Sequence, residues 1–132
     1  MVLPITLTMA AAAAFLHIWL AIRCSMVRIK EKVMTGDGGS ATMLNRMRAH
    51  SNFTENAPLF VILLGLNELA DGSSRWLWGA GIVFIVARLS HAIGMDRPAP
   101  NIFRAGGMLL TTLVLIALSV SAVLLSDRKS VV

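Results

Sequence analysis

The hydrophobic residues of this chain fall into long runs separated by short polar segments. The first run, Leu3 to Ile22, is interrupted only by Thr6, Thr8 and His17. At about 1.5 Å per residue, this run matches a bilayer core of about 30 Å. Basic residues follow the run and none precedes it, which is the reverse of the charge order in a signal peptide. We therefore expect a retained membrane-spanning helix.

The remaining runs predict three more helices. Between residues 43 and 70 the first half is polar and the second half, Leu59 to Leu66, is apolar, with Pro58 at the junction. About ten apolar residues cannot cross a membrane alone, so the polar half must complete the crossing while it faces other helices or a water-filled cleft. Trp76 and Trp78, typical interfacial anchors, open the third run. The stretch 105–125 is an unbroken apolar span.

Together these runs predict an all-α integral membrane protein. We expect one domain over residues 1–132, folded as an antiparallel bundle of four transmembrane helices at about 3–27, 43–70, 75–95 and 103–126. Segments rich in glycine, proline and polar residues predict three short connections, one of them from Asn67 to Ser74. Such a bundle uses almost the whole chain, so any chemistry must occur within it or at its mouths.

Composition and charge agree with this architecture. The chain is 56% hydrophobic and 14% charged, with a mean hydropathy of +0.73, which is too apolar for the charged surface of a soluble domain. Three of its twelve Lys and Arg residues lie at one face of the predicted bundle: Arg75, Arg128 and Lys129. The other nine lie at the opposite face: Arg23, Arg28, Lys30, Lys32, Arg46, Arg48, Arg88, Arg97 and Arg104. This positive-inside bias predicts non-cytoplasmic termini and argues against nucleic-acid binding.

Cysteine and histidine do not suggest a metal centre. Cys24 is the lone cysteine, so an internal disulfide is excluded and we interpret it as a packing thiol. The three histidines, His17, His50 and His91, come from three different predicted helices and lack the spacing of metal ligands. No metal site is expected.

Charged residues inside the predicted spans carry the functional information. Arg48, Asn52 and Glu55 stand at i, i+4 and i+7, on one face of the second helix, and Arg88 and His91 stand at i and i+3 on the third. Polar residues at membrane depth are costly unless paired, so they mark either a ligand site or a structural ion pair.

A count of charges favours the ligand site. Arg48, Arg88 and Arg104, with Arg28 close by, are four cations against one nearby carboxylate, Glu55. An anion would balance the surplus, and arginine suits carboxylates because its planar guanidinium binds them through two hydrogen bonds. The alternative is that Glu55 neutralises one of these arginines and that Asn52 joins helices through hydrogen bonds.

Two sequence segments resemble motifs of a known family. The segment 48–55, RAHSNFTE, followed by Pro58 and Leu59, resembles the second-helix signature of the membrane-associated proteins in eicosanoid and glutathione metabolism, the MAPEG family. The segment 87–91, ARLSH, resembles the third-helix motif, and Arg104 before the last span resembles the family's remaining arginine. The resemblance covers essentially the whole chain.

The resemblance implies a fold, an assembly and a ligand. MAPEG proteins are left-handed four-helix bundles that form homotrimers and bind glutathione between adjacent subunits near the cytoplasmic face. Carried over by position, Arg48 and Asn52 would bind glutathione and Glu55 would bind its ammonium group. The neighbouring subunit would supply Arg28. Arg88 and His91 would line the same pocket.

Arg104 is the catalytic candidate implied by the resemblance. A free thiol titrates near pKa 8.5, and a guanidinium beside it stabilises the thiolate, which is the nucleophile. The alternative is that Arg104 extends to the membrane interface at the start of the last span.

The chain also departs from the family pattern. It has no tyrosine, whereas the eicosanoid enzymes of the family use tyrosines beside glutathione; here Asn56 and Met95 occupy two such positions, and Ser51 stands where some relatives have another arginine. These differences argue against leukotriene or prostaglandin synthesis. We therefore expect a microsomal-type glutathione transferase or peroxidase that acts on lipophilic electrophiles or hydroperoxides. The compact chain favours a bacterial inner membrane, and an endoplasmic reticulum location would fit the family equally well.

Two other functions remain open at this stage. The first is a noncatalytic membrane scaffold of the same fold that binds lipids or anions and uses the charged cluster to hold a trimer together. The second is a transporter, which is disfavoured because four short helices contain no internal repeat of the kind that alternating access usually needs.

Overall fold

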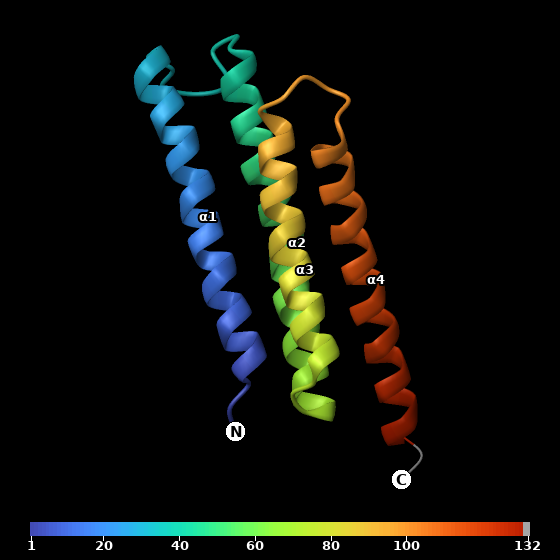
Figure 1. Cartoon of the computed structure of the whole chain (residues 1–132). Coiled ribbons are helices and arrows are strands. Elements are labelled where there is room, and N and C mark those ends of the chain that lie inside the picture. The colour runs from blue at the N-terminus through green and yellow to red at the C-terminus, as the bar shows by residue number, and fades with distance from the viewer. Residues whose placement is uncertain (131–132) are drawn as a thin grey trace.

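The computed structural model describes residues 1–130, and these form four helices and no strand. They are α1 (Pro4–Glu31), α2 (Ala41–Asp71), α3 (Arg75–Met95) and α4 (Ile102–Ser130). Neighbouring helices run antiparallel (Figure 1), so the α1–α2 and α3–α4 loops lie at one end of the bundle, called here the two-loop end, and the chain termini lie at the other. The all-α membrane bundle predicted from the sequence is confirmed.

By length and composition, α1, α3 and α4 are each long and apolar enough to cross a membrane. Helix α2 is not among them, because its half toward the two-loop end is polar, as the sequence indicated. It nevertheless has 31 residues and packs against all three other helices, whereas α1 and α4 do not touch each other. In its polar half, Met43, Ala49 and Phe53 are buried, whereas Arg48 and Glu55 are exposed.

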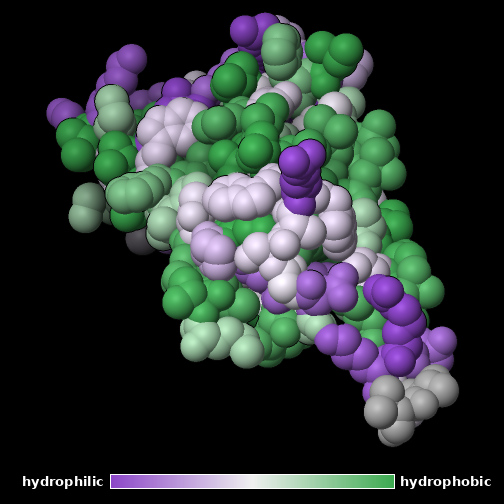
Figure 2. All heavy atoms as spheres, turned by 60° about the horizontal axis from the view of Figure 1, so that its bottom comes forward, coloured by the Kyte–Doolittle hydropathy of each residue, from purple (hydrophilic) through white to green (hydrophobic). Residues whose placement is uncertain are grey.

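Apolar side chains from all four helices form the core. Phe60 of α2 and Phe84 of α3 stack with their ring centroids 3.8 Å apart, and both are fully buried. Other apolar side chains point outward from the bundle. Figure 2, which brings the terminal end forward, shows hydrophobic residues around the sides, pale residues across the middle, and hydrophilic residues near the end of α4 and along the far edge. This surface is what a lipid environment requires.

Two helix ends differ from the sequence-based prediction. Helix α4 continues through Ser130 rather than ending near residue 126. Helix α2 continues through Asp71, so the predicted connection beginning at Asn67 is wrong: Asn67 and Glu68 lie inside the helix and are buried. Polar composition suggested a loop there, but both side chains have hydrogen-bond partners on other elements.

Candidate functional site

A polar cavity of about 240 Å³ opens near the two-loop end of the bundle, between α2, α3 and α4. Five of the residues predicted for the site line it, together with two that were noted only as departures from the family pattern: Arg48, Asn52, Glu55, His91 and Arg104, with Ser51 and Met95. The three residues on one face of α2 therefore do meet the polar residues of α3 and α4.

Glycines bring the walls of this cavity together. A Cβ atom added at Gly94 would lie 2.3 Å from the backbone nitrogen of Arg104, and one at Gly107 would lie 2.6 Å from the carbonyl oxygen of Ala87. Helices α3 and α4 therefore approach with their backbones almost in contact, as small residues allow in membrane bundles. This close approach places Arg104 beside the α3 residues of the cavity.

Arg88 does not line the cavity but lies behind its wall. Its side chain is 1% exposed. One guanidinium nitrogen donates to Asn52 Oδ1 and lies 3.2 Å from His91 Nδ1, and the other donates to Thr111 Oγ1 at 3.2 Å. Arg88 thus contacts two of the residues that do line the cavity.

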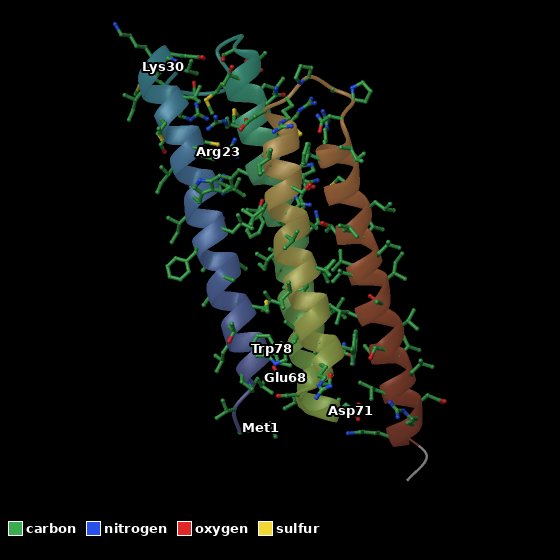
Figure 3. The ribbon with its side chains drawn as sticks, viewed as in Figure 1. Met1, Arg23, Lys30, Glu68, Asp71 and Trp78 are labelled. Carbon is green, nitrogen blue, oxygen red and sulfur yellow. The ribbon has the colours of Figure 1, made fainter. Side chains whose placement is uncertain are left out.

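The ion pairs at this end of the bundle leave the cavity arginines free. Among residues 1–130, ion pairs form only between Asp96 and two arginines, Arg23 and Arg46, which join α1 and α2 to the end of α3. Within the same residues, Glu55 has no cationic partner within 4.0 Å, so the alternative in which it neutralises an arginine is not supported in a single chain. Figure 3 labels Arg23 at this end, among many nitrogen-bearing side chains.

Arg28 lies apart from the cavity in its own chain. Its guanidinium donates to the carbonyl oxygen of Gly36 at 3.0 Å, in the α1–α2 loop. It also lines a separate hollow of about 410 Å³ between α1 and α2, together with Cys24 and His50. Arg28 therefore does not line the cavity of its own chain, although Ser51 lines both hollows.

The structure shows two polar clusters that the sequence did not predict, around Asp96 and around Glu68. It also brings together His17 and His50, which the sequence analysis treated as unrelated. Asp96, at the end of α3, is the carboxylate that pairs with Arg23 and Arg46. Glu68 accepts hydrogen bonds at the start of α1. His17 and His50 lie with ring nitrogens 3.1 Å apart on α1 and α2. Glu68 follows the buried Phe60 and Leu64 of α2 at steps of four residues, a helical spacing that the turn-like composition around Glu68 obscured.

Comparisons with known proteins agree with the bundle and its motifs. The MAPEG family profile matches residues 6–124. The chain is 29% identical over 86 residues to the inner membrane protein YecN of Escherichia coli strain K12, and equally to YecN of strain O6:H1. Each match covers 64% of this chain and 65% of the relative, so the similarity spans a little less than two thirds of these relatives. The family profile covers most of the sequence, and the chain belongs to the MAPEG family.

Proposed function

We propose that this protein is a membrane-bound, glutathione-dependent transferase or peroxidase of detoxifying type. The observation that carries the proposal is the cavity in which Arg48 and Arg104 face the same space as Glu55 without an ion-pair partner among the described residues. Glutathione has two carboxylates, one ammonium group and one thiol. Two guanidinium groups and one carboxylate complement these charges.

The residues of the cavity divide the work by their chemistry. Arg48 and Asn52 bind the carboxylates, and Glu55 accepts hydrogen bonds from the ammonium group. Arg104 stabilises the thiolate, which is the reactive form of the thiol. In transfer, the sulfur forms a bond to an electrophilic carbon and the leaving group departs with its electron pair. In peroxide reduction, a hydroperoxide becomes an alcohol and water as two glutathione molecules become a disulfide.

The lipid-facing surface indicates the second substrate. Outward-pointing apolar side chains on α1, α3 and α4 place the bundle in a bilayer, where lipophilic electrophiles and lipid hydroperoxides dissolve. We further propose an inner-membrane location, because the relatives are named inner membrane protein YecN, with the two-loop end and its surplus of basic residues toward the cytoplasm. The assembly proposed is a homotrimer in which Arg28 reaches the neighbouring subunit's cavity.

Calorimetry with glutathione on the detergent-purified protein tests the proposal. The Arg48→Ala variant should bind at least about tenfold more weakly, because a charge-assisted hydrogen bond contributes roughly 1.5–3 kcal/mol. Arg128→Ala, at the exposed far end of α4, is the matched control and should bind normally. Thiolate absorbance and turnover of chlorodinitrobenzene and cumene hydroperoxide are measured on the same samples.

The outcomes separate the candidate functions. Binding with a thiolate signal and turnover supports the enzyme. Binding of glutathione or of another anion without turnover supports the noncatalytic scaffold. Absence of binding at millimolar glutathione contradicts the proposal.

A further inference from the structure

The buried guanidinium of Arg88 is in contact with two residues of the cavity wall. It donates to Asn52 Oδ1 on α2, and the same nitrogen lies 3.2 Å from His91 Nδ1, one turn away on α3. No carboxylate among residues 1–130 lies within 4.0 Å of it. Arg88 therefore acts on the cavity through neutral polar neighbours rather than through an ion pair.

A guanidinium group can only donate hydrogen bonds, and this restricts both neighbours. The amide atom of Asn52 that faces Arg88 must be its oxygen, so the NH₂ group of that amide faces away. The nitrogen of His91 that faces Arg88 must carry a lone pair. The ring hydrogen of a neutral His91 therefore sits on Nε2, and a doubly protonated ring would set an N–H and a second positive charge against the guanidinium.

The hydroxyl of Thr111 likewise accepts a hydrogen bond from Arg88. It donates to the carbonyl oxygen of Gly107 at 2.8 Å, which leaves its oxygen to accept from Arg88 at 3.2 Å. Every polar contact of Arg88 thus has one consistent orientation. Thr111 is fully buried, so this orientation is shielded from water.

Asn52 Nδ2 and His91 Nε2 are the donors that remain. Neither atom makes a hydrogen bond within residues 1–130. Neither is among the fully buried side-chain nitrogen and oxygen atoms that lack a hydrogen-bond partner in that part of the chain. Both residues line the cavity. Their N–H groups are therefore available to a ligand, beside the guanidinium groups of Arg48 and Arg104.

We propose that Arg88 is a positioning residue that makes this part of the cavity a donor-only surface, by holding Asn52 and His91 with their N–H groups toward the ligand. Such a surface takes a group that only accepts hydrogen bonds, which is a carboxylate or a thiolate. It excludes ammonium groups, which Glu55 at the cavity receives instead. The choice of glutathione as the probe rests on the proposed function, but the donor orientation does not.

Nitrogen NMR on protein labelled with ¹⁵N-histidine tests the orientation directly. Long-range ¹⁵N–¹H correlations distinguish the two neutral tautomers, and the chain has only three histidines, so the His91→Gln variant assigns the signal. At neutral pH His91 should be the neutral Nε2–H tautomer. The Nδ1–H tautomer or an imidazolium in the wild-type protein would overturn the proposal, whether or not glutathione binds.

Variants separate positioning from general stability. Arg88→Met should release His91 into a mixture of tautomers and weaken glutathione binding about tenfold, by the loss of one oriented donor set. If that variant does not fold, Arg88→Gln, which removes the charge and can accept as well as donate hydrogen bonds, serves in its place. An unchanged tautomer in the folded variant contradicts the proposal.

His91 itself supplies a conservative rescue. Gln places an N–H group near the position of Nε2, so His91→Gln should retain glutathione binding within a few-fold, whereas His91→Leu should lose about tenfold. Equal affinity of the two variants contradicts the role of the Nε2–H donor. If wild-type protein binds no glutathione, the proposed function fails, and the NMR result alone decides the donor orientation.

Discussion

Glu68 and Thr6 are joined by two hydrogen bonds, one from the backbone amide of Thr6 at 2.8 Å and one from its hydroxyl at 2.7 Å, both to Glu68 Oε2. The other carboxylate oxygen accepts from the amide of Ile5 and the hydroxyl of Ser73. Glu68 thus satisfies free amides in the first turn of α1, where a negative charge also suits the helix dipole. Figure 3 labels this residue at the terminal end of the bundle.

Replacing this carboxylate should destabilise the bundle without changing its site. Glu68→Gln loses acceptors for buried donors, and we expect a loss of roughly 2–3 kcal/mol in the free energy of unfolding. Equilibrium unfolding in mixed detergent and SDS micelles measures it. Asp71→Asn is the control, because Asp71 is exposed one turn further along the same helix. Equal effects of the two changes would contradict the capping role.

Asp96 is expected to hold α1 and α2 to the end of α3. Asp96→Asn removes the charge that compensates buried Arg23 and half-buried Arg46, and should cost roughly 2 kcal/mol of unfolding free energy. The double variant Asp96→Asn/Arg23→Met should cost less than the sum of the two single-variant costs, because the partners are in contact. Strictly additive costs would show that this ion pair contributes nothing. Glu31→Gln, an exposed carboxylate at the same end, is the control.

The helices could be predicted from the sequence because the bilayer sets their length and Gly, Pro and polar segments mark the connections. The family resemblance, on the motifs from Arg48 to Glu55 and Ala87 to His91, is confirmed by the family profile. The trimer and the binding of glutathione stay predictions. The end of α4 was underestimated, and Asn67 and Glu68 were assigned to a connection, because polar side chains at a helix end look like a loop when their partners are unknown.

The contacts made by individual polar residues could not be predicted. Arg88 and His91, three residues apart, share a face of α3, but that spacing still separates them by about 60° around the helix. This is enough to place His91 in the cavity wall and Arg88 behind it. Likewise, the partner of Asp96 depends on the path of the loop that follows α3, which sequence spacing does not define.

The close contact between α3 and α4 should be sensitive to a single methyl group at one glycine and not at its neighbour. Gly107→Ala sets a Cβ against the backbone of Ala87 and His91, so the helices must separate, at a cost of about 1–3 kcal/mol. Gly106→Ala meets nothing within 4 Å and should be neutral or stabilising, since alanine favours a helix. Unfolding and glutathione binding are measured for both. Similar behaviour of the two variants would contradict this packing.

Arg104 should act on the thiol rather than on overall affinity. In Arg104→Gln, bound glutathione should keep its thiol protonated at neutral pH, since the pKa of the thiol returns toward about 8.5. Thiolate absorbance should disappear, and kcat should fall about 100-fold, as for removal of one charge-stabilising group. Arg97→Gln, an exposed arginine that stacks on Phe103, is the control. A retained thiolate signal in Arg104→Gln would assign the role to another residue.

Arg28 does not line the cavity of its own chain, and the proposal that it contributes from another chain is testable by mixing subunits. Within one chain it binds the α1–α2 loop and lines a different hollow. We expect Arg28→Ala and Arg48→Ala each to weaken glutathione binding when expressed alone. Coexpressed with two different affinity tags and purified through both, the mixed oligomers should regain some strong sites, in which Arg48 of one chain meets Arg28 of the next.

A strong site between subunits needs an intact Arg48 from one chain and an intact Arg28 from its neighbour, and the mixed oligomers contain such pairs. If Arg28 acted within its own chain, every chain of the mixture would still lack one of the two residues, and no strong site could form. Calorimetry of the mixed oligomers therefore distinguishes a site between subunits from a site within one. A mixture of Arg48→Ala with Glu55→Gln is the control: both residues line the same cavity of one chain and both are assigned to binding, so mixing should restore no strong site.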